Sequence, residues 1–96
     1  MIPNQSIALT DRFVQGAGNI VSDMDGEKVM LSIHNSKYYN LGEVGGDIWE
    51  QLAQPAEVER IVDSLMRQYE VERDDCEHQV VSFLQHLLEE GLIQWA

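Results

Sequence analysis

The side chains of this sequence that could support catalytic or metal chemistry are one cysteine and three histidines. Cys76 and His78 are two residues apart in a stretch with helical periodicity, and His86 follows two turns later. On a helix only residues three or four apart share a face, so Cys76 and His78 point to different sides. Cys76 also belongs to an apolar stripe, without the base and orienting group that a nucleophile needs. With His34 far upstream, the pattern predicts no catalytic residue, no metal site and no cofactor, and hence a protein that is not an enzyme.

The length and the net charge of the chain limit the number of domains and the classes of molecule that it could bind. A chain of 96 residues predicts one domain, and seventeen acidic residues against six basic ones give a formal net charge of −11. This charge would repel nucleic acid, because binding to a phosphate backbone depends largely on Lys and Arg, so we expect no nucleic-acid partner. The N-terminus lacks the basic flank and apolar run of a signal peptide, and no segment approaches the roughly 20 apolar residues of a membrane helix. We expect a soluble, cytoplasmic protein with no membrane partner.

Three short strands are predicted in the first half of the chain. Asp25-Gly26 indicates a two-residue type I′ hairpin turn, because both central positions of that turn take a positive φ. Downstream, apolar residues alternate with the period of a half-buried strand, and "NS" marks a second turn. The sequence predicts a three-strand meander at roughly 19–24, 28–34 and 37–41.

The third strand, "KYYNL", should lie at the edge of this meander. Its unpaired N–H and C=O groups could then pair with an added peptide strand. By parity Tyr39 and Leu41 should face the helices, whereas Tyr38 and Asn40 take the opposite face.

Two helices are predicted directly after the strands. Periodic apolar residues from Val44 to Leu52 mark the first, and its Gly45-Gly46 pair would let it lie close beneath the third strand. Pro55 suits the first position of the second helix, where its missing N–H costs nothing. The second helix carries an amphipathic stripe with helical spacing.

A third helix is predicted from about Asp74. Glu77, three residues later, would complete a capping box, and Gly91 would serve as the C-cap. The apolar stripe of this helix consists of Cys76, Val80, Phe83, Leu84, Leu87 and Leu88.

Three antiparallel strands followed by three helices predict the α+β class. The compact arrangement packs one face of the meander onto a three-helix bundle, which is similar to a winged helix-turn-helix. Residues 19–96 would form this domain. Residues 1–18 form an N-terminal segment in which "IALTDRFVQ" could add a strand, and the sequence leaves open whether the segment is partly disordered.

The chain resembles the PqqD-like family. The family pattern "GKYYxLNxxGxxIW" reads "SKYYNLGEVGGDIW" here, and the family's following helices match "AEVERIVDSLMRQYEV" and "EHQVVSFLQHLLEEGLI". The resemblance covers about residues 19–93, and it is greatest to free-standing members of lasso-peptide gene clusters. Such proteins are recognition elements for the leader peptides of ribosomally synthesised, post-translationally modified peptides.

The resemblance implies that a precursor's leader, typically with a Tyr-x-x-Pro motif, adds as an antiparallel strand to the third strand, in the groove against the third helix. The protein would present this leader to a leader peptidase and to the cyclase of the pathway. For the helix wall of the groove we favour the flank of Cys76 and Phe83, and the flank of Val81 and Leu88 stays open. The candidate peptide-binding residues are then Lys37, Tyr38, Tyr39, Asn40 and Leu41 on the strand, and Cys76, Gln79, Val80, Phe83 and Leu87 on the third helix.

The sequence departs from the family pattern at three positions. Ser36 stands in place of the turn glycine, where Asn35 can still supply the left-handed conformation. Gly42 replaces an asparagine and is an acceptable N-cap. Gln79 replaces an aspartate on the third helix, which bears on which leader is bound.

Two alternative functions share this fold. A PqqD-type peptide chaperone would deliver its precursor to a radical-SAM enzyme, so only the partner would differ. A winged-helix DNA-binding regulator would need a basic recognition helix, whereas "DDCEHQVVSFLQHLLEE" has no Lys or Arg. The acidic start of that helix, with Asp74, Asp75 and Glu77, would instead attract a leader with basic residues near its N-terminus.

Overall fold

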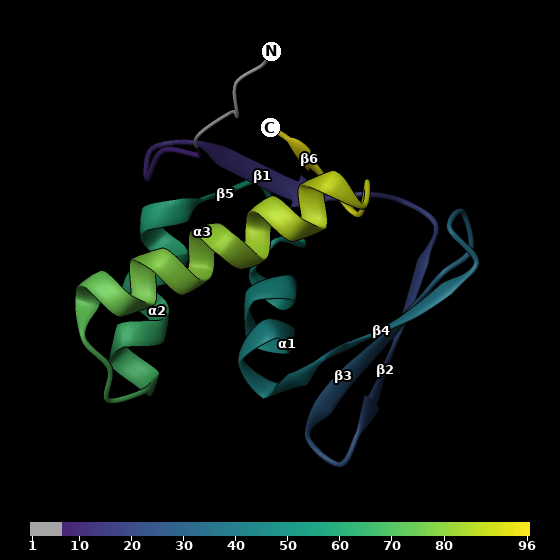
Figure 1. Cartoon of the computed structure of the whole chain (residues 1–96), viewed down its shortest axis with the longest axis horizontal. Helices are drawn as coiled ribbons and strands as arrows, with labels where there is room; N and C mark the ends of the chain where they lie inside the picture. Colours follow the sequence, from purple (N-terminus) through teal and green to yellow (C-terminus); the bar gives the residue numbers. More distant parts are fainter. Residues whose placement is uncertain (1–6) are drawn as a thin grey trace.

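The structure is a computed structural model and describes residues 7–96. Two small sheets flank a group of three helices, with one sheet near the chain ends and the other extending to the side (Figure 1). The elements are β1 (Arg12–Gln15), β2 (Asn19–Met24), β3 (Glu27–Ser32), β4 (Lys37–Leu41), α1 (Gly42–Gln51), β5 (Ala56–Glu57), α2 (Val58–Gln68), α3 (Arg73–Glu89) and β6 (Ile93–Trp95). Within the described residues, no helix has the length and apolar character needed to cross a bilayer.

The predicted α+β class and meander are confirmed. β2, β3 and β4 form an antiparallel sheet in that order, and the turn at Asp25 (φ 56°) and Gly26 (φ 86°) has the predicted positive dihedrals. In the second turn the left-handed residue is Ser36 (φ 55°), so the assignment of that conformation to Asn35 is wrong. Asn35 instead hydrogen-bonds through its backbone N–H and its side chain, and the N–H donates to Oγ of Ser32.

One face of the meander packs on the helices and the other is open. Met30 and Ser32 of β3 are fully buried on the inner face. Ile33, which follows β3, is exposed on the outer side, as are Ile20 of β2 and Tyr38 of β4. Ile20 and Tyr38 lie opposite the same β3 residue, so they belong to one cross-strand row.

The N-terminal segment contributes a strand to a second sheet. β1 lies between β5 and β6 in this sheet, and Phe13 of β1 is fully buried, with its ring centroid 4.6 Å from that of Trp95. Residues 1–6 of the segment lie outside the described residues. The prediction that Pro55 begins the second helix is wrong, because Ala56 and Glu57 pair with β1 and α2 begins after them.

The helix ends follow the sequence signals only in part. The capping box predicted at Asp74 is wrong, because α3 begins one residue earlier and Glu77 accepts a hydrogen bond from Arg73 instead. The C-cap at Gly91 is confirmed, since this residue has φ 76° and its N–H donates to the carbonyl oxygen of Leu88. The N–H of the following residue donates to the carbonyl oxygen of Leu87, which completes a Schellman motif.

The double glycine brings α1 close to two other elements. A Cβ on Gly46 would overlap Cγ of Lys28 on β3, and a Cβ on Gly45 would lie 3.0 Å from Cζ of Phe83 on α3. Leu41 of β4 would be 3.4 Å from the latter Cβ, an ordinary contact. The close approach is therefore confirmed, but the strand that requires it is β3 and not β4.

Candidate functional site

The free edge of β4 presents main-chain groups on one side of the meander. In the described residues β4 pairs only with β3, through a register that includes Met30 opposite Tyr39. The N–H of Ile33 donates to the carbonyl oxygen of Gly18. The next pair along β2 and β3, Asn19 opposite Ser32, is therefore a non-hydrogen-bonded pair. Alternation along the ladder then directs the main-chain groups of Met30 toward β4.

The same alternation fixes the direction of the main chain in β4 itself. Tyr39 exchanges its main-chain bonds with Met30, so the N–H and C=O groups of Tyr38 and Asn40 point away from β3. These are the groups that a fourth strand would use. An antiparallel strand beside β4 would therefore pair with Tyr38 and Asn40.

The side chains of β4 have the predicted orientations. Tyr39 and Leu41 are half-buried and pack against the core, whereas Tyr38 is 75% exposed and Asn40 is exposed. Lys37 is exposed as well. The strand thus offers one face to the helices, one face to solvent, and a free edge.

A polar cluster holds the first half of β4 against the end of α3. The hydroxyl of Tyr39 donates to Oε1 of Glu90 at 2.6 Å, and Nδ2 of Asn35 donates to the Tyr39 hydroxyl and to the backbone carbonyl of Glu90. Nζ of Lys37 lies 3.6 Å from the same Glu90 carboxylate. The Tyr39 hydrogen bond, followed by the Lys37 charge, lowers the pKa of Glu90 from its ordinary value of 4.5.

An apolar pocket opens at the other end of β4. Its volume is about 920 Å³, and it lies between the end of β4, α1, the end of α2 and the part of α3 from Asp75 to His86. Leu41, Ile48, Leu65 and Phe83 supply apolar wall, and Gly45 gives the Phe83 ring room to lie against α1. The pocket is large enough for more than one side chain of a bound peptide.

The predicted third-helix residues divide between this pocket and the core. Those that line the pocket are Cys76, Gln79, Val80 and Phe83, and Leu41 of β4 lies with them. Leu87 is fully buried in the core and does not line it. Lys37, Tyr38, Tyr39 and Asn40 lie along β4 outside the pocket.

The other flank of α3 has a different environment. Val81 borders a separate depression of about 370 Å³, and Leu88 packs partly buried against the core. The larger pocket is thus on the Cys76/Phe83 flank. The sequence did not predict that α1 and α2 form walls of this pocket. Val44 and Leu65 belong to apolar stripes with helical spacing, but residues of the core show the same pattern.

Two further groups at the pocket have clear partners. The hydroxyl of Tyr69 donates to Oδ2 of Asp47 at 2.7 Å, which raises the pKa of Tyr69 to about 12 and ties the end of α2 to α1. The Cys76 side chain is buried, with its sulfur 4.0 Å from the carbonyl oxygen of Val62, and burial raises the pKa of its thiol. A raised pKa disfavours the thiolate that a nucleophile or metal ligand requires.

Two solved structures are similar to this chain. TbiB1 in complex with the TbiA(beta) leader peptide is 28% identical, with a TM-score of 0.77, and the match covers 84% of this chain and 94% of that one. A lasso peptide synthetase B1 complexed with the leader peptide is 24% identical, with a TM-score of 0.75 and coverage of 85% and 96%, and it shows a likeness of fold. No curated protein sequence gives a significant match.

A protein-family model, described as coenzyme PQQ synthesis protein D (PqqD), matches residues 27–93. This range covers more than half of the chain and includes β3, β4 and all three helices. It also contains the strand edge and the pocket described above. The chain therefore belongs to the PqqD family.

Proposed function

We propose that this protein binds the leader region of a ribosomally synthesised precursor peptide by strand addition to β4, in the groove against α3. It presents the bound leader to the leader peptidase and cyclase of a lasso-peptide pathway, and it is not itself an enzyme. The observation that carries the proposal is the free edge of β4, where the main-chain groups of Tyr38 and Asn40 point outward beside an apolar pocket.

Strand addition explains how the two features act together. Main-chain bonds to Tyr38 and Asn40 would provide affinity that tolerates many leader sequences, and the pocket at Leu41 and Phe83 would select side chains. The two similar structures support this proposal, because each holds a leader peptide. Lys37, Tyr39, Cys76, Gln79, Val80 and Leu87 complete the proposed peptide-binding set, with Leu87 acting from the core beneath the groove.

A PqqD-type chaperone that serves a radical-SAM enzyme remains the second candidate, because the matching family model is that of a PQQ synthesis protein. DNA binding is disfavoured by charge. α3 begins with Arg73, one residue before the stretch "DDCEHQVVSFLQHLLEE", which has no Lys or Arg. The guanidinium of Arg73 lies within 4 Å of carboxylate oxygens of Glu59, Asp63 and Glu77. Such a neutralised cation contributes little to phosphate binding.

The test is fluorescence anisotropy with a labelled synthetic leader peptide that carries a Tyr-x-x-Pro motif. We expect saturable binding to the wild type, no binding of a scrambled peptide or a DNA duplex, and at least about tenfold weaker binding to Tyr38→Pro, which loses an outward N–H. Circular dichroism should show that Tyr38→Pro stays folded, because proline is tolerated where the N–H of an edge strand faces solvent.

The matched control is Tyr38→Ala, which removes the ring but keeps the N–H. Its affinity should fall much less than that of Tyr38→Pro. Equal affinity of Tyr38→Pro and wild type would contradict strand addition, and binding of the duplex alone would contradict the whole proposal. To separate the two candidate pathways, a leader peptidase and a radical-SAM enzyme can each be assayed with and without this protein.

A further inference from the structure

The apolar pocket has an acidic mouth, formed by Glu70, Glu72 and Asp75. Glu70 and Glu72 lie in the connection between α2 and α3, and Asp75 lies in the first turn of α3; all three line the pocket and are exposed. None of them takes part in an ion pair or a side-chain hydrogen bond with another described residue. Three carboxylates thus lie at the pocket without an ion-pair partner in the part of the chain that the structure describes.

The cation nearest to these residues in the sequence, Arg73, forms ion pairs with other carboxylates. Arg73 lies between these residues in sequence, but its guanidinium is 2.9 Å from Asp63 and 2.8 Å from Glu77, neither of which lines the pocket. The α3 dipole stabilises Asp75 in the first helical turn, yet it gives no reason for Glu70 to lie at the pocket. Like charges held together cost stability unless a ligand balances them.

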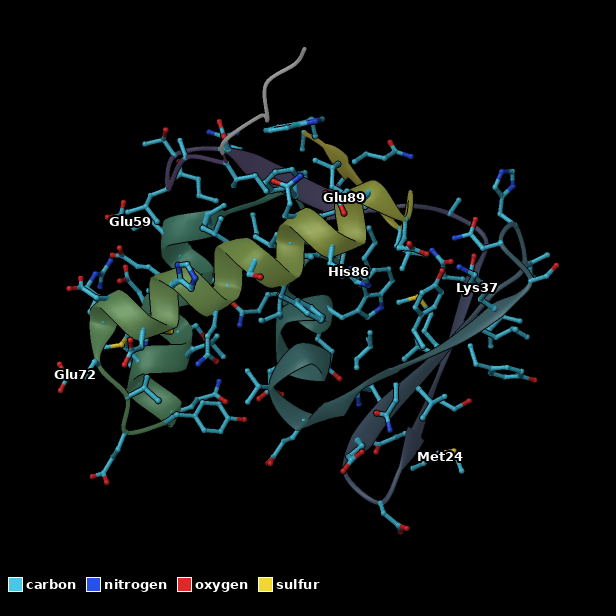
Figure 2. The ribbon with its side chains drawn as sticks, viewed as in Figure 1. Met24, Lys37, Glu59, Glu72, His86 and Glu89 are labelled. Carbon is cyan, nitrogen blue, oxygen red and sulfur yellow. The ribbon has the colours of Figure 1, made fainter. Side chains whose placement is uncertain are left out.

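The direction of β4 decides which part of a bound peptide would meet this mouth. β4 runs from Lys37 toward Leu41, and of its residues only Leu41 lines the pocket. Beyond Leu41 the pocket continues along α3 to the acidic mouth, so that Glu72 and Lys37 lie at opposite ends of the site (Figure 2). The N-terminal end of a strand that pairs antiparallel with β4 would lie beside Leu41. The peptide residues that precede this added strand would then enter the pocket.

We propose that the acidic mouth selects leader peptides with basic residues immediately before the segment that pairs with β4. The inference rests on the proposed function and adds a charge requirement to it. Lys or Arg side chains of the leader would extend along the apolar wall, which includes the exposed Val71, and place their charges beside Glu70, Glu72 and Asp75. The net charge of −11 would also speed association with such a leader at low salt.

The test uses two labelled versions of a synthetic leader peptide with a Tyr-x-x-Pro motif, one with two lysines and one with two glutamines immediately before that motif. Both are titrated by anisotropy into wild type and into the triple variant Glu70→Gln, Glu72→Gln, Asp75→Asn. The matched control is the triple variant Asp25→Asn, Glu27→Gln, Glu89→Gln, which removes the same number of charges from exposed positions that do not line the pocket.

We expect wild type to bind the lysine version roughly tenfold more tightly than the glutamine version at low salt. The mouth variant should lose this preference and the control should keep most of it, and added salt should reduce it. Equal preference in the mouth variant and wild type would overturn the inference while leaving strand addition in place. Failure of both peptides to bind wild type would overturn the proposed function and this inference together.

Discussion

The two sheets of this protein differ in how far they are buried and in whether an outer edge is free. In the sheet β5-β1-β6 the central strand carries Phe13, which is fully buried and contacts the Trp95 ring. In the sheet β2-β3-β4 an outer strand is free along one edge, and its most prominent side chain, Tyr38, is exposed. The first sheet is packed into the core, whereas in the described residues one edge of the second sheet has no neighbouring strand.

The second sheet is held to the helices by a few specific contacts. At one end Gly46 lets α1 approach Lys28 of β3, and at the other the Tyr39 hydroxyl reaches Glu90 after α3. Met30 and other inner residues fill the space between them. These contacts attach the sheet to the helices without covering the free edge of β4.

The largest effect should come from the buried sheet. Phe13→Ala removes a fully buried aromatic ring, so the free energy of unfolding should fall by about 3–5 kcal/mol. Ile20→Ala, on the exposed face of the meander, is the control and should cost less than about 1 kcal/mol. Urea denaturation measures both. Similar losses in the two variants would mean that the two sheets do not differ in their contribution to the core.

An intermediate effect is expected where α1 meets β3. Gly46→Ala adds a Cβ that overlaps Cγ of Lys28, and the crowding should outweigh the higher helix propensity of alanine, with a net loss of about 1–2 kcal/mol. In a Lys28→Ala background the same substitution should cost less, because Cγ is absent. A stabilising Gly46→Ala in the wild-type background would show that α1 and β3 have room to separate.

The smallest effect should be the pH-dependent contribution of Glu90. The Tyr39 hydrogen bond lowers the pKa of Glu90 in the folded state, so its contribution is present above the ordinary value of 4.5 and is lost as the pH falls through the lowered folded-state pKa. The stability difference between wild type and Glu90→Gln should therefore narrow between about pH 7 and pH 3.

Tyr39→Phe tests the cause of this dependence. It removes the donor to Glu90 and leaves the carboxylate in place, so the pH dependence attributed to Glu90 should largely disappear. Urea denaturation at several pH values measures all three proteins. An unchanged dependence in Tyr39→Phe would mean that Lys37 and His86, and not the Tyr39 hydrogen bond, lower the pKa of Glu90.

Local sequence signals predicted the elements whose determinants lie within a few residues. The Asp25-Gly26 turn, the alternating faces of β4 and the C-cap at Gly91 were all predicted correctly, because each depends on φ preference or on the two-residue period of a strand. The signals at Pro55 and Asp74 were equally local and gave the wrong helix starts.

Those two errors have identifiable causes. Ala56 and Glu57 after Pro55 are drawn into a strand by β1, which lies more than forty residues earlier, and that pairing has no local signature. At the start of α3, Arg73 bridges Glu77 and Asp63, so the carboxylate expected in the capping box is used elsewhere. Long-range partners thus overrode local preferences that were individually reasonable.

The sequence by itself determined the meander, its free edge strand, the orientation of Tyr38 and Tyr39, and the acidic character of the chain. Only the tertiary structure decided which flank of α3 forms the pocket, that α1 and α2 supply its other walls, and that Tyr39 bonds to Glu90, 51 residues away. The reason is physical: backbone preference and periodicity act between neighbours in the chain, whereas a pocket exists only where several distant segments meet and leave space.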